Sequence, residues 1–191
     1  MDITQTFYDN LSTQYDKLFL DWQTTTHEQA AILSKLIADI GFDKRARILD
    51  CACGIGTQAI GLAALGYTVT ASDISDGELA EANKRAEKNG VNILFKHTDF
   101  CSLSDVFSEK FDIVIAMDNA LPHMLTIEAL EAAVRSITDQ IKAAVSLWPV
   151  SVIMTASYLR SHHIPHRISI KRIMDSEFLF KHGFGAETTI S

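Results

Sequence analysis

Residues 46–75 read ARILDCACGIGTQAIGLAALGYTVTASDIS, and this stretch decides the fold. Its opening, ARILDCACG, is a short apolar run that enters a glycine turn, which is typical of a buried parallel strand. TQAIGLAALG reads as a helix that ends at Gly66. YTVTASDIS is strand-like, because Thr68, Val69 and Thr70 are β-branched. The stretch therefore predicts a strand, a helix and a second strand in immediate succession.

The same alternation continues as far as Lys142. Ser75 begins a capping box with Glu78, and Thr126 is the predicted cap of a later helix. Further helices are predicted over 78–90 and 127–141, and further strands over 91–100 and 110–120. Alternating strands and helices with short connections predict an α/β fold, in which helices cover both faces of a mostly parallel sheet.

Two amphipathic helices are predicted before the first strand. Across residues 5–22, apolar side chains recur every three or four positions, at Phe7, Leu11, Tyr15, Leu18 and Trp22. Residues 27–40 form the second predicted helix, which ends at Gly41. We expect residues 1–42 to form a helical cap on the domain.

Composition excludes several classes of protein. A chain of 191 residues, 47% hydrophobic and 21% charged, has the make-up of one globular domain. The net charge of -7 disfavours nucleic acid as a partner, and three cysteines are too few for a disulfide framework. No run is long and apolar enough for a membrane span, and the N-terminus lacks the pattern of a signal peptide. We therefore expect a cytoplasmic protein without a membrane partner.

The loop after the first predicted strand fits two cofactor classes. Gly54 and Gly56 let a ligand approach the backbone closely at the start of a helix. Together with Ala59 they satisfy the G-x-G-x-x-A pattern of dinucleotide sites, which suits an NAD-dependent oxidoreductase. Asp50 favours S-adenosylmethionine instead, because a carboxylate repels pyrophosphate and attracts a sulfonium cation. The candidate cofactor-binding residues of this loop are Asp50, Ala52, Cys53, Gly54 and Gly56.

Acidic residues also follow the second and third predicted strands. Asp73 stands 17 positions after Gly56, where a carboxylate can accept hydrogen bonds from ribose hydroxyls, and Ile74 follows it. Asp99 and Phe100 combine an acceptor with an aromatic face, which suits an adenine. Taken alone, that pair is more typical of a turn aspartate beside a core phenylalanine.

The fourth loop, MDNALPH, brings several polar groups to the end of a buried strand, where they are costly unless they face a ligand. Asp118 and Asn119 are therefore candidates for contact with a cofactor or substrate. Asn119 and His123 are the candidates for a catalytic role. His123 fits a general base and a hydrogen-bonded structural histidine equally well.

No metal site is predicted. His162, His163 and His166 form an H-H-x-x-H cluster, but no fourth ligand is evident. Cys51 and Cys53 are more typical of small buried residues than of metal ligands.

Three segments, in this order, resemble those of class I S-adenosylmethionine-dependent methyltransferases. They are ILDCACGIGTQAIGLAALGYTVTASDIS, the TDF after the third strand and AMDNALPHML after the fourth. The segment YDKLF, residues 15–19, resembles a pattern of the glycine N-methyltransferase-like subgroup. The resemblance covers roughly residues 7–142 and implies a Rossmann-like fold.

The resemblance also implies roles for particular residues. Gly54 and its neighbours would line the methionine moiety, and Asp73 would bind the ribose. Asp99 and Phe100 would flank the adenine, and Asn119 would lie near the reacting centre. The remaining cofactor-binding candidates are Ile74, Asp118, Tyr15 and Trp22.

The resemblance ends at Lys142. A glycine pair, a strand and a loop like RDYD are expected next, and residues 143–191 contain none of them. When each codon is read one base earlier, the genetic code permits SGGLFLASIRDYDGKLSEKPPYSP from the start of this segment. We therefore hypothesise that residues from about Ala143 onward are an out-of-frame tail, with the family's C-terminal strands missing or replaced. A genuinely divergent C-terminus is the alternative.

The sequence thus predicts a methyltransferase domain over residues 1–142 and an atypical tail over 143–191. The expected reaction is methyl transfer from S-adenosylmethionine to a small polar acceptor, at nitrogen. We expect cofactor binding to survive the altered C-terminus better than turnover does. The alternatives are an NAD-dependent oxidoreductase and a cofactor-binding pseudoenzyme without catalysis.

Overall fold

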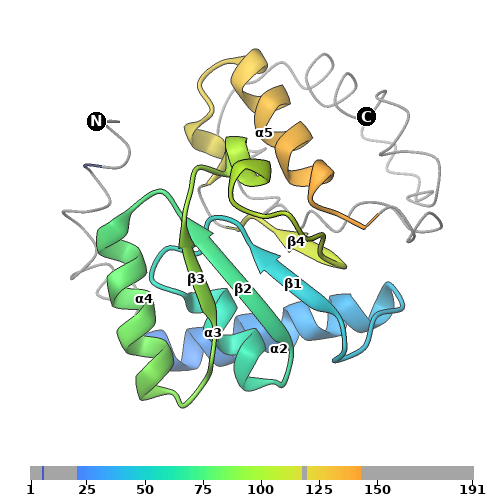
Figure 1. The fold of residues 1–191 in the computed structure, drawn as a ribbon. Helices are drawn as coiled ribbons and strands as arrows, with labels where there is room; N and C mark the ends of the chain where they lie inside the picture. Colours follow the sequence, from blue (N-terminus) through green and yellow to red (C-terminus); the bar gives the residue numbers. More distant parts are fainter. Residues whose placement is uncertain (1–5, 7–20, 118–119, 143–191) are drawn as a thin grey trace, which may run out of the picture.

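A computed structural model of the protein describes Thr6, residues 21–117 and residues 120–142. These residues form a four-stranded parallel sheet with the strand order β3-β2-β1-β4 (Figure 1). The strands are β1 (Arg47–Asp50), β2 (Thr68–Asp73), β3 (Leu94–His97) and β4 (Ile113–Ile115). The predicted α/β fold with a parallel sheet is confirmed.

Helices cover both faces of this sheet. The α-helices are α2 (Trp22–Asp39), α3 (Thr57–Ala64), α4 (Asp76–Lys88) and α5 (Ile127–Asp139), and two short 3-10 helices are η2 (Phe100–Asp105) and η3 (Leu121–His123). In Figure 1, α2, α3 and α4 lie on one side of the sheet, and α5 lies on the other side. The connections between strands are therefore those of a doubly wound fold.

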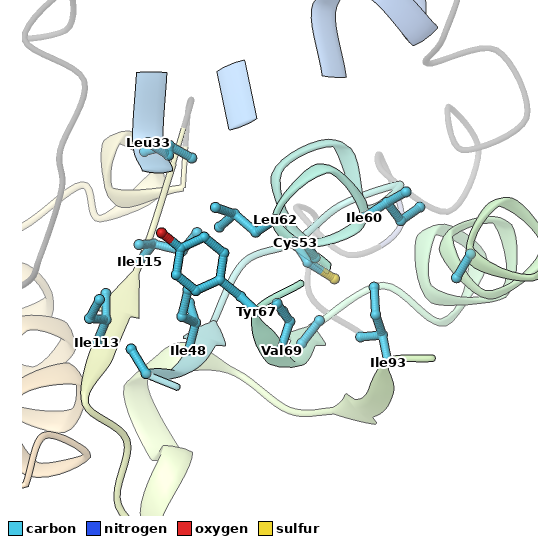
Figure 2. Close-up of a cluster of buried hydrophobic side chains, with 14 of the residues drawn as sticks. Leu33, Ile48, Cys53, Ile60, Leu62, Tyr67, Val69, Ile93, Ile113 and Ile115 are labelled. Atoms are coloured by element: carbon cyan, nitrogen blue, oxygen red, sulfur yellow. The ribbon is translucent and has the colours of Figure 1, made fainter. Parts of the chain in front are cut away.

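The core is divided in two by the sheet. Along β1, Ile48 belongs to the cluster under α2 and α3, whereas Leu49 belongs to the cluster under η2 and α5. The same alternation occurs in β4, because successive side chains of a strand point to opposite faces. Figure 2 shows the first cluster, in which Leu33 of α2 and Leu62 of α3 lie over the sheet residues. Both faces are buried, which explains why β1 and β4 read as continuous apolar runs.

The N-terminal helix boundary differs from the prediction. Asp21 has an extended backbone, with φ at -148°, and its carboxylate accepts hydrogen bonds from the amides of Gln23 and Thr24. Asp21 is thus the cap of α2, so Trp22 begins that helix and does not end the helix predicted over residues 5–22. The sequence pattern missed the boundary because the apolar spacing runs on across the cap. Tyr15 and most of that predicted helix lie outside the described residues.

Two predicted helix caps are confirmed, and two predicted strands are shorter in the structure. The Ser75 hydroxyl accepts a hydrogen bond from the Glu78 amide, and the Thr126 hydroxyl accepts one from the Ala129 amide, as predicted for caps. The strands predicted over 91–100 and 110–120 are shorter, at four and three residues. Within the described residues, no helix combines the length and apolar character that crossing a membrane requires.

Candidate functional site

The strand order places the loops of interest at one edge of the sheet. The chain runs from β1 outward to β2 and β3 and then returns to the other side of β1 with β4, so the order reverses at β1. Ligands of such sheets bind beyond the carboxyl ends of the strands at this reversal. The loop after β1 is tied to both neighbouring strands, because the Cys51 amide donates to Ile115 O and the Cys53 amide donates to Ser72 O. The glycine loop therefore lies at this edge, beside the carboxyl ends of β2 and β4.

The glycine loop leads directly into α3. Gly56 is the cap residue of α3 and has φ at +88°, a left-handed backbone that favours glycine. A Cβ at Gly56 would lie 2.9 Å from Ile60 Cδ1 and 3.3 Å from Ala82 Cβ. Gly56 has no side chain, so it makes no side-chain cap bond at the start of α3.

Asp73 joins the glycine loop to the loop after β2. Its Oδ2 accepts a hydrogen bond of 2.8 Å from the Gly54 amide, and its Oδ1 accepts one of 3.0 Å from the Ser75 amide. Burial raises the pKa of Asp73, although these backbone amides oppose the shift. The sequence reasoning placed Asp73 at this edge correctly, but it did not foresee the bond to Gly54. Whether Asp73 also holds a ribose stays a prediction.

Two more carboxylates lie beside the glycine loop. Asp50 is fully buried, and Glu78 of α4 is only 3% exposed. The Glu78 Oε2 lies 3.0 Å from the position that a Cβ on Gly54 would take. Burial raises the pKa of Cys53, and the charges of Asp73, Asp50 and Glu78 raise it further, which places all three carboxylates near this thiol. Three acidic side chains therefore gather at this loop, a composition that would suit a cationic ligand.

Glu78 was expected only as part of a helix cap. Its position three residues after Ser75 is the signal for that role, and the same position carries its carboxylate to the glycine loop. The sequence alone gives no sign of that second feature, because it depends on how α4 packs against the loop.

The loop after β3 makes the contacts expected of a turn aspartate beside a core phenylalanine. Asp99 caps η2, where its Oδ1 accepts a hydrogen bond of 2.8 Å from the Cys101 amide. Phe100 is partly buried against the core cluster below η2 and α5. Ile74 lies at the same edge, and its carbonyl accepts a hydrogen bond of 2.8 Å from His97 Nε2. Sequence reasoning did not select His97, which is in register with Asp73 on the neighbouring strand.

The remaining candidates are only partly described. Asp118, Asn119 and Tyr15 lie outside the described residues. His123 is half-buried at the end of η3, and its backbone amide donates to Ala120 O. Its catalytic role stays a prediction.

Trp22 and Ala52 are described and lie near the loop. Trp22 Nε1 donates a hydrogen bond of 3.0 Å to the hydroxyl of Thr57, the first residue of α3. Ala52 is half-buried in the turn between Cys51 and Cys53. Whether Trp22 and Ala52 bind a cofactor stays a prediction.

The described cysteines are free thiols, and Cys51 and Cys53 are buried. Among the described residues, no group of three or more His, Cys, Asp and Glu side chains is arranged to hold a metal ion. His162, His163 and His166 lie outside these residues.

A family model with the description "Methyltransferase domain" matches residues 48–143, which hold the sheet, the glycine loop and α5. The chain belongs to this methyltransferase family. S-adenosylmethionine is the cofactor of the family, so the comparison decides against the dinucleotide interpretation of the glycine loop.

Curated relatives of this methyltransferase domain protein match only parts of it. A ubiquinone biosynthesis O-methyltransferase of Dinoroseobacter shibae is 41% identical over 75 residues, which are 39% of this chain and 30% of the relative. An S-adenosyl-L-methionine-dependent Diels-Alderase of Neonectria sp. is 33% identical over 82 residues, which are 41% of this chain and 34% of the relative. The chain spans about a third of the length of these relatives.

Solved structures share the fold of this methyltransferase domain protein. The CcbJ methyltransferase of Streptomyces caelestis matches with a TM-score of 0.61 and 21% identity, over 73% of this chain and 54% of that one. Magnesium protoporphyrin IX methyltransferase of Synechocystis, with bound S-adenosylhomocysteine, matches with a TM-score of 0.59 and 20% identity, over 73% and 67% of the two chains. These likenesses confirm the Rossmann-like fold.

Proposed function

We propose that this protein transfers a methyl group from S-adenosylmethionine to the nitrogen of a small polar acceptor. Family membership supports the cofactor and the reaction. The observation that carries the proposal for this chain is the acidic glycine loop. Asp73 accepts a hydrogen bond from the Gly54 amide, Glu78 Oε2 lies 3.0 Å from the position of a Cβ on Gly54, and Asp50 ends β1 just before the loop. The positive charges of a sulfonium and an ammonium group would suit a loop with these acidic side chains, whereas the negative charge of a pyrophosphate would not.

The described residues fit such a cofactor. The backbone of Gly54 and Gly56, at the start of α3, would receive the methionine moiety. Asp73 would accept hydrogen bonds from the ribose with the lone pairs that its bonds to backbone amides leave available. Ile74 and Phe100, which follow β2 and β3, would lie against the adenine.

The cofactor supplies an electrophilic methyl group on a positively charged sulfur. The protein's part is to hold the acceptor nitrogen in line with that carbon and to exclude water, since alignment supplies much of the rate in such displacements. The nitrogen lone pair forms the new bond to carbon as the bond from carbon to sulfur breaks, and the product nitrogen then loses a proton. His123 is the described side chain that we propose for accepting this proton.

Titration calorimetry with S-adenosylhomocysteine tests the cofactor site. We expect folded full-length protein to bind it, and Asp73→Ala to weaken binding strongly. NADH serves as the control ligand and is expected not to bind. Folded protein that gives no heat with S-adenosylhomocysteine would contradict the proposed site.

An assay with radiolabelled methyl groups tests the acceptor class. Matched amines and phenols separate nitrogen from oxygen as the acceptor, and this comparison matters because one relative is named as an O-methyltransferase. Transfer to phenols alone would overturn the nitrogen assignment without affecting the cofactor site.

The second candidate is a protein that binds the cofactor without transferring methyl groups. The relative from Neonectria is named for a Diels-Alder reaction and not for methyl transfer, so likeness over this region does not dictate the reaction. Binding of S-adenosylhomocysteine without turnover of any amine or phenol would favour this candidate.

The proposal also covers the subgroup of the family and the origin of residues 143–191. We place the chain in the glycine N-methyltransferase-like subgroup on the YDKLF pattern of residues 15–19. We also propose that residues from about Ala143 onward are translated out of frame, because one alternative frame offers both the missing glycine pair and the RDYD loop. Resequencing the gene around the Lys142 codon tests this. The absence of that open frame would remove the idea.

A further inference from the structure

Trp22 connects the start of α2 to the start of α3. Its indole Nε1 donates a hydrogen bond of 3.0 Å to Thr57 Oγ1, across 35 positions of sequence. Thr57 is only 4% exposed and directly follows Gly56. The bond therefore ends on the residue where the glycine loop becomes a helix.

Arg85 of α4 lies over the face of the indole ring. Its guanidinium carbon lies 4.6 Å from the centre of the Trp22 ring, within the range of a cation–π interaction. Arg85 is itself fixed by Glu81, whose Oε1 lies 2.9 Å from Arg85 Nε and 2.8 Å from Nη2. Both of these side chains are largely buried, at 14% and 19% exposed. The indole is thus held between α4 and the first residue of α3.

These contacts join the helices that follow two site loops. Helix α3 follows the glycine loop, and α4 follows the loop that contains Asp73. A displaced first turn of α3 would move the Gly54 amide, which is bound to Asp73. Loss of the indole bond would also leave the buried Thr57 hydroxyl without this partner, and the backbone would shift to find another.

We propose that Trp22 is a positioning residue for the cofactor loop, acting through Thr57 and held in place by Arg85. The inference rests on the proposed function, because it concerns the same cofactor. It differs from the prediction that Trp22 touches the cofactor itself. In the positioning role, Trp22 and Thr57 act together through one hydrogen bond. Removing either side chain's part in that bond should therefore have the same effect on binding as removing both.

A double-mutant cycle on the full chain tests this proposal. Trp22→Phe keeps an aromatic ring for Arg85 but removes the indole donor, and Thr57→Val keeps the shape but removes the acceptor. Each variant is expected to raise the Kd for S-adenosylhomocysteine by about threefold to tenfold, as for one lost hydrogen bond. The double variant should bind as each single variant does, and Thr57→Ser should restore most of the affinity. Thr138→Val, which removes a hydroxyl bond on α5, is the matched control and should bind normally.

The outcomes separate the possibilities. If the two single effects multiply in the double variant, Trp22 acts independently of Thr57 and the positioning role is wrong. Unchanged affinity in Trp22→Phe would also overturn it. Urea unfolding of each variant establishes that binding is measured on folded protein. Failure of the folded wild-type chain to bind S-adenosylhomocysteine would instead contradict the proposed function.

Discussion

Cys51 and Cys53 show how strongly the glycine loop departs from an ordinary surface turn. Both thiols are buried, and burial raises the pKa of each well above its usual range. The neighbouring charges of Asp50 and Asp73 raise these pKa values further, because they oppose the formation of a thiolate. We therefore expect both cysteines to pack beside the carboxylates and not to act as nucleophiles.

Alkylation tests this account of the thiols. In folded protein at pH 8, we expect iodoacetamide to leave Cys51 and Cys53 unmodified, since the thiolate is the reactive form. Burial also raises the pKa of Cys101 to about 12, so it should react slowly although it is partly exposed. Mass spectrometry before and after denaturation in urea counts the modified sites. Rapid native labelling of Cys53 would contradict the burial of this loop.

Gly56 offers a test of the loop's backbone. In Gly56→Ala the new methyl group would meet Ile60 and Ala82. We expect this crowding to lower the free energy of unfolding by about 1–3 kcal/mol, in addition to the cost of the left-handed backbone. Gly66→Ala is the matched control, because Gly66 has a similar φ but open space around it. Urea unfolding measures both. Equal losses in the two variants would show that crowding at Gly56 is unimportant.

At the level of single residues, the sequence predicted what local patterns specify. The glycine turn at Gly54 and Gly56 and the place of Asp73 at the end of β2 were predictable, because glycine spacing and an acid at the end of a strand are local signals. The contact of Glu78 with the glycine loop and that of Thr57 with Trp22 were not predictable, because each depends on how distant segments pack.

Helices α2 and α3 pack so closely that their contact requires a glycine. A Cβ at Gly61 would lie 2.7 Å from both Ala30 Cβ and the carbonyl oxygen of Thr26. Alanine normally stabilises a helix relative to glycine by about 1 kcal/mol. We expect Gly61→Ala to destabilise the protein instead, by about 1–3 kcal/mol, because backbone atoms must move. Thermal unfolding checks the sign, and a stabilised variant would contradict the packing.

Asp112 links three elements at the amino end of the sheet. It accepts hydrogen bonds of 2.8 Å from the Arg47 amide and from Lys142 Nζ. Burial alone would raise the pKa of Asp112, but these bonds and the positive charges of Lys142 and Arg47 lower it overall. A carboxyl with a lowered pKa stabilises the fold at neutral pH, and this contribution is lost as the pH falls through the folded-state value.

The charge of Asp112 can be tested by its dependence on pH. We expect Asp112→Asn to cost about 0.5–1 kcal/mol at pH 7, the range for a partly exposed ion pair. The difference in the free energy of unfolding between the variant and the wild type should be present above the unfolded-state pKa, about 3.9. It should shrink below that pKa as the wild-type carboxyl is protonated. Urea unfolding on both sides of that pKa measures it. A difference that persists at low pH would point to geometry and not charge.

At the level of elements, types were predicted better than boundaries. Alternation of strands and helices is set by the period of the apolar residues, which the chain shows from β1 to α5. The start of α2 was missed because its cap, Asp21, lies within an unbroken apolar pattern. The strands β3 and β4 were predicted too long, because β-branched and apolar residues continue past their last ladder bonds.

At the scale of the whole molecule, the chain is still bound to the sheet when it reaches Lys142. The Phe111 amide donates to Gln140 O, and the Lys142 amide donates to Phe111 O, which forms a parallel bridge beside β4. The sequence could not predict this bridge, because Phe111 and Ile141 are thirty positions apart. The chain is therefore aligned with the sheet at the point where the proposed change of frame occurs.

Restoring the reading frame after Lys142 tests the proposal at this scale. We expect the restored protein to unfold at a higher temperature than the present chain and to transfer methyl groups faster. S-adenosylhomocysteine should raise the Tm of both proteins, because binding to the folded state alone shifts the equilibrium. Differential scanning fluorimetry and the methyl-transfer assay measure these effects. A restored protein with no gain in Tm or turnover would argue for a divergent C-terminus.

The parallel sheet also gives the molecule two unlike ends. The proposed cofactor loops leave the carboxyl ends of the strands, whereas Arg45, with a side chain 90% exposed, lies before β1 at the opposite end. Its ion pair with Asp43 is exposed and contributes little to stability. A single cysteine introduced as Arg45→Cys would therefore accept a dye or a sensor-chip linker in preference to the buried thiols. Protein immobilised in this way would present the carboxyl ends of its strands to the flowing solution.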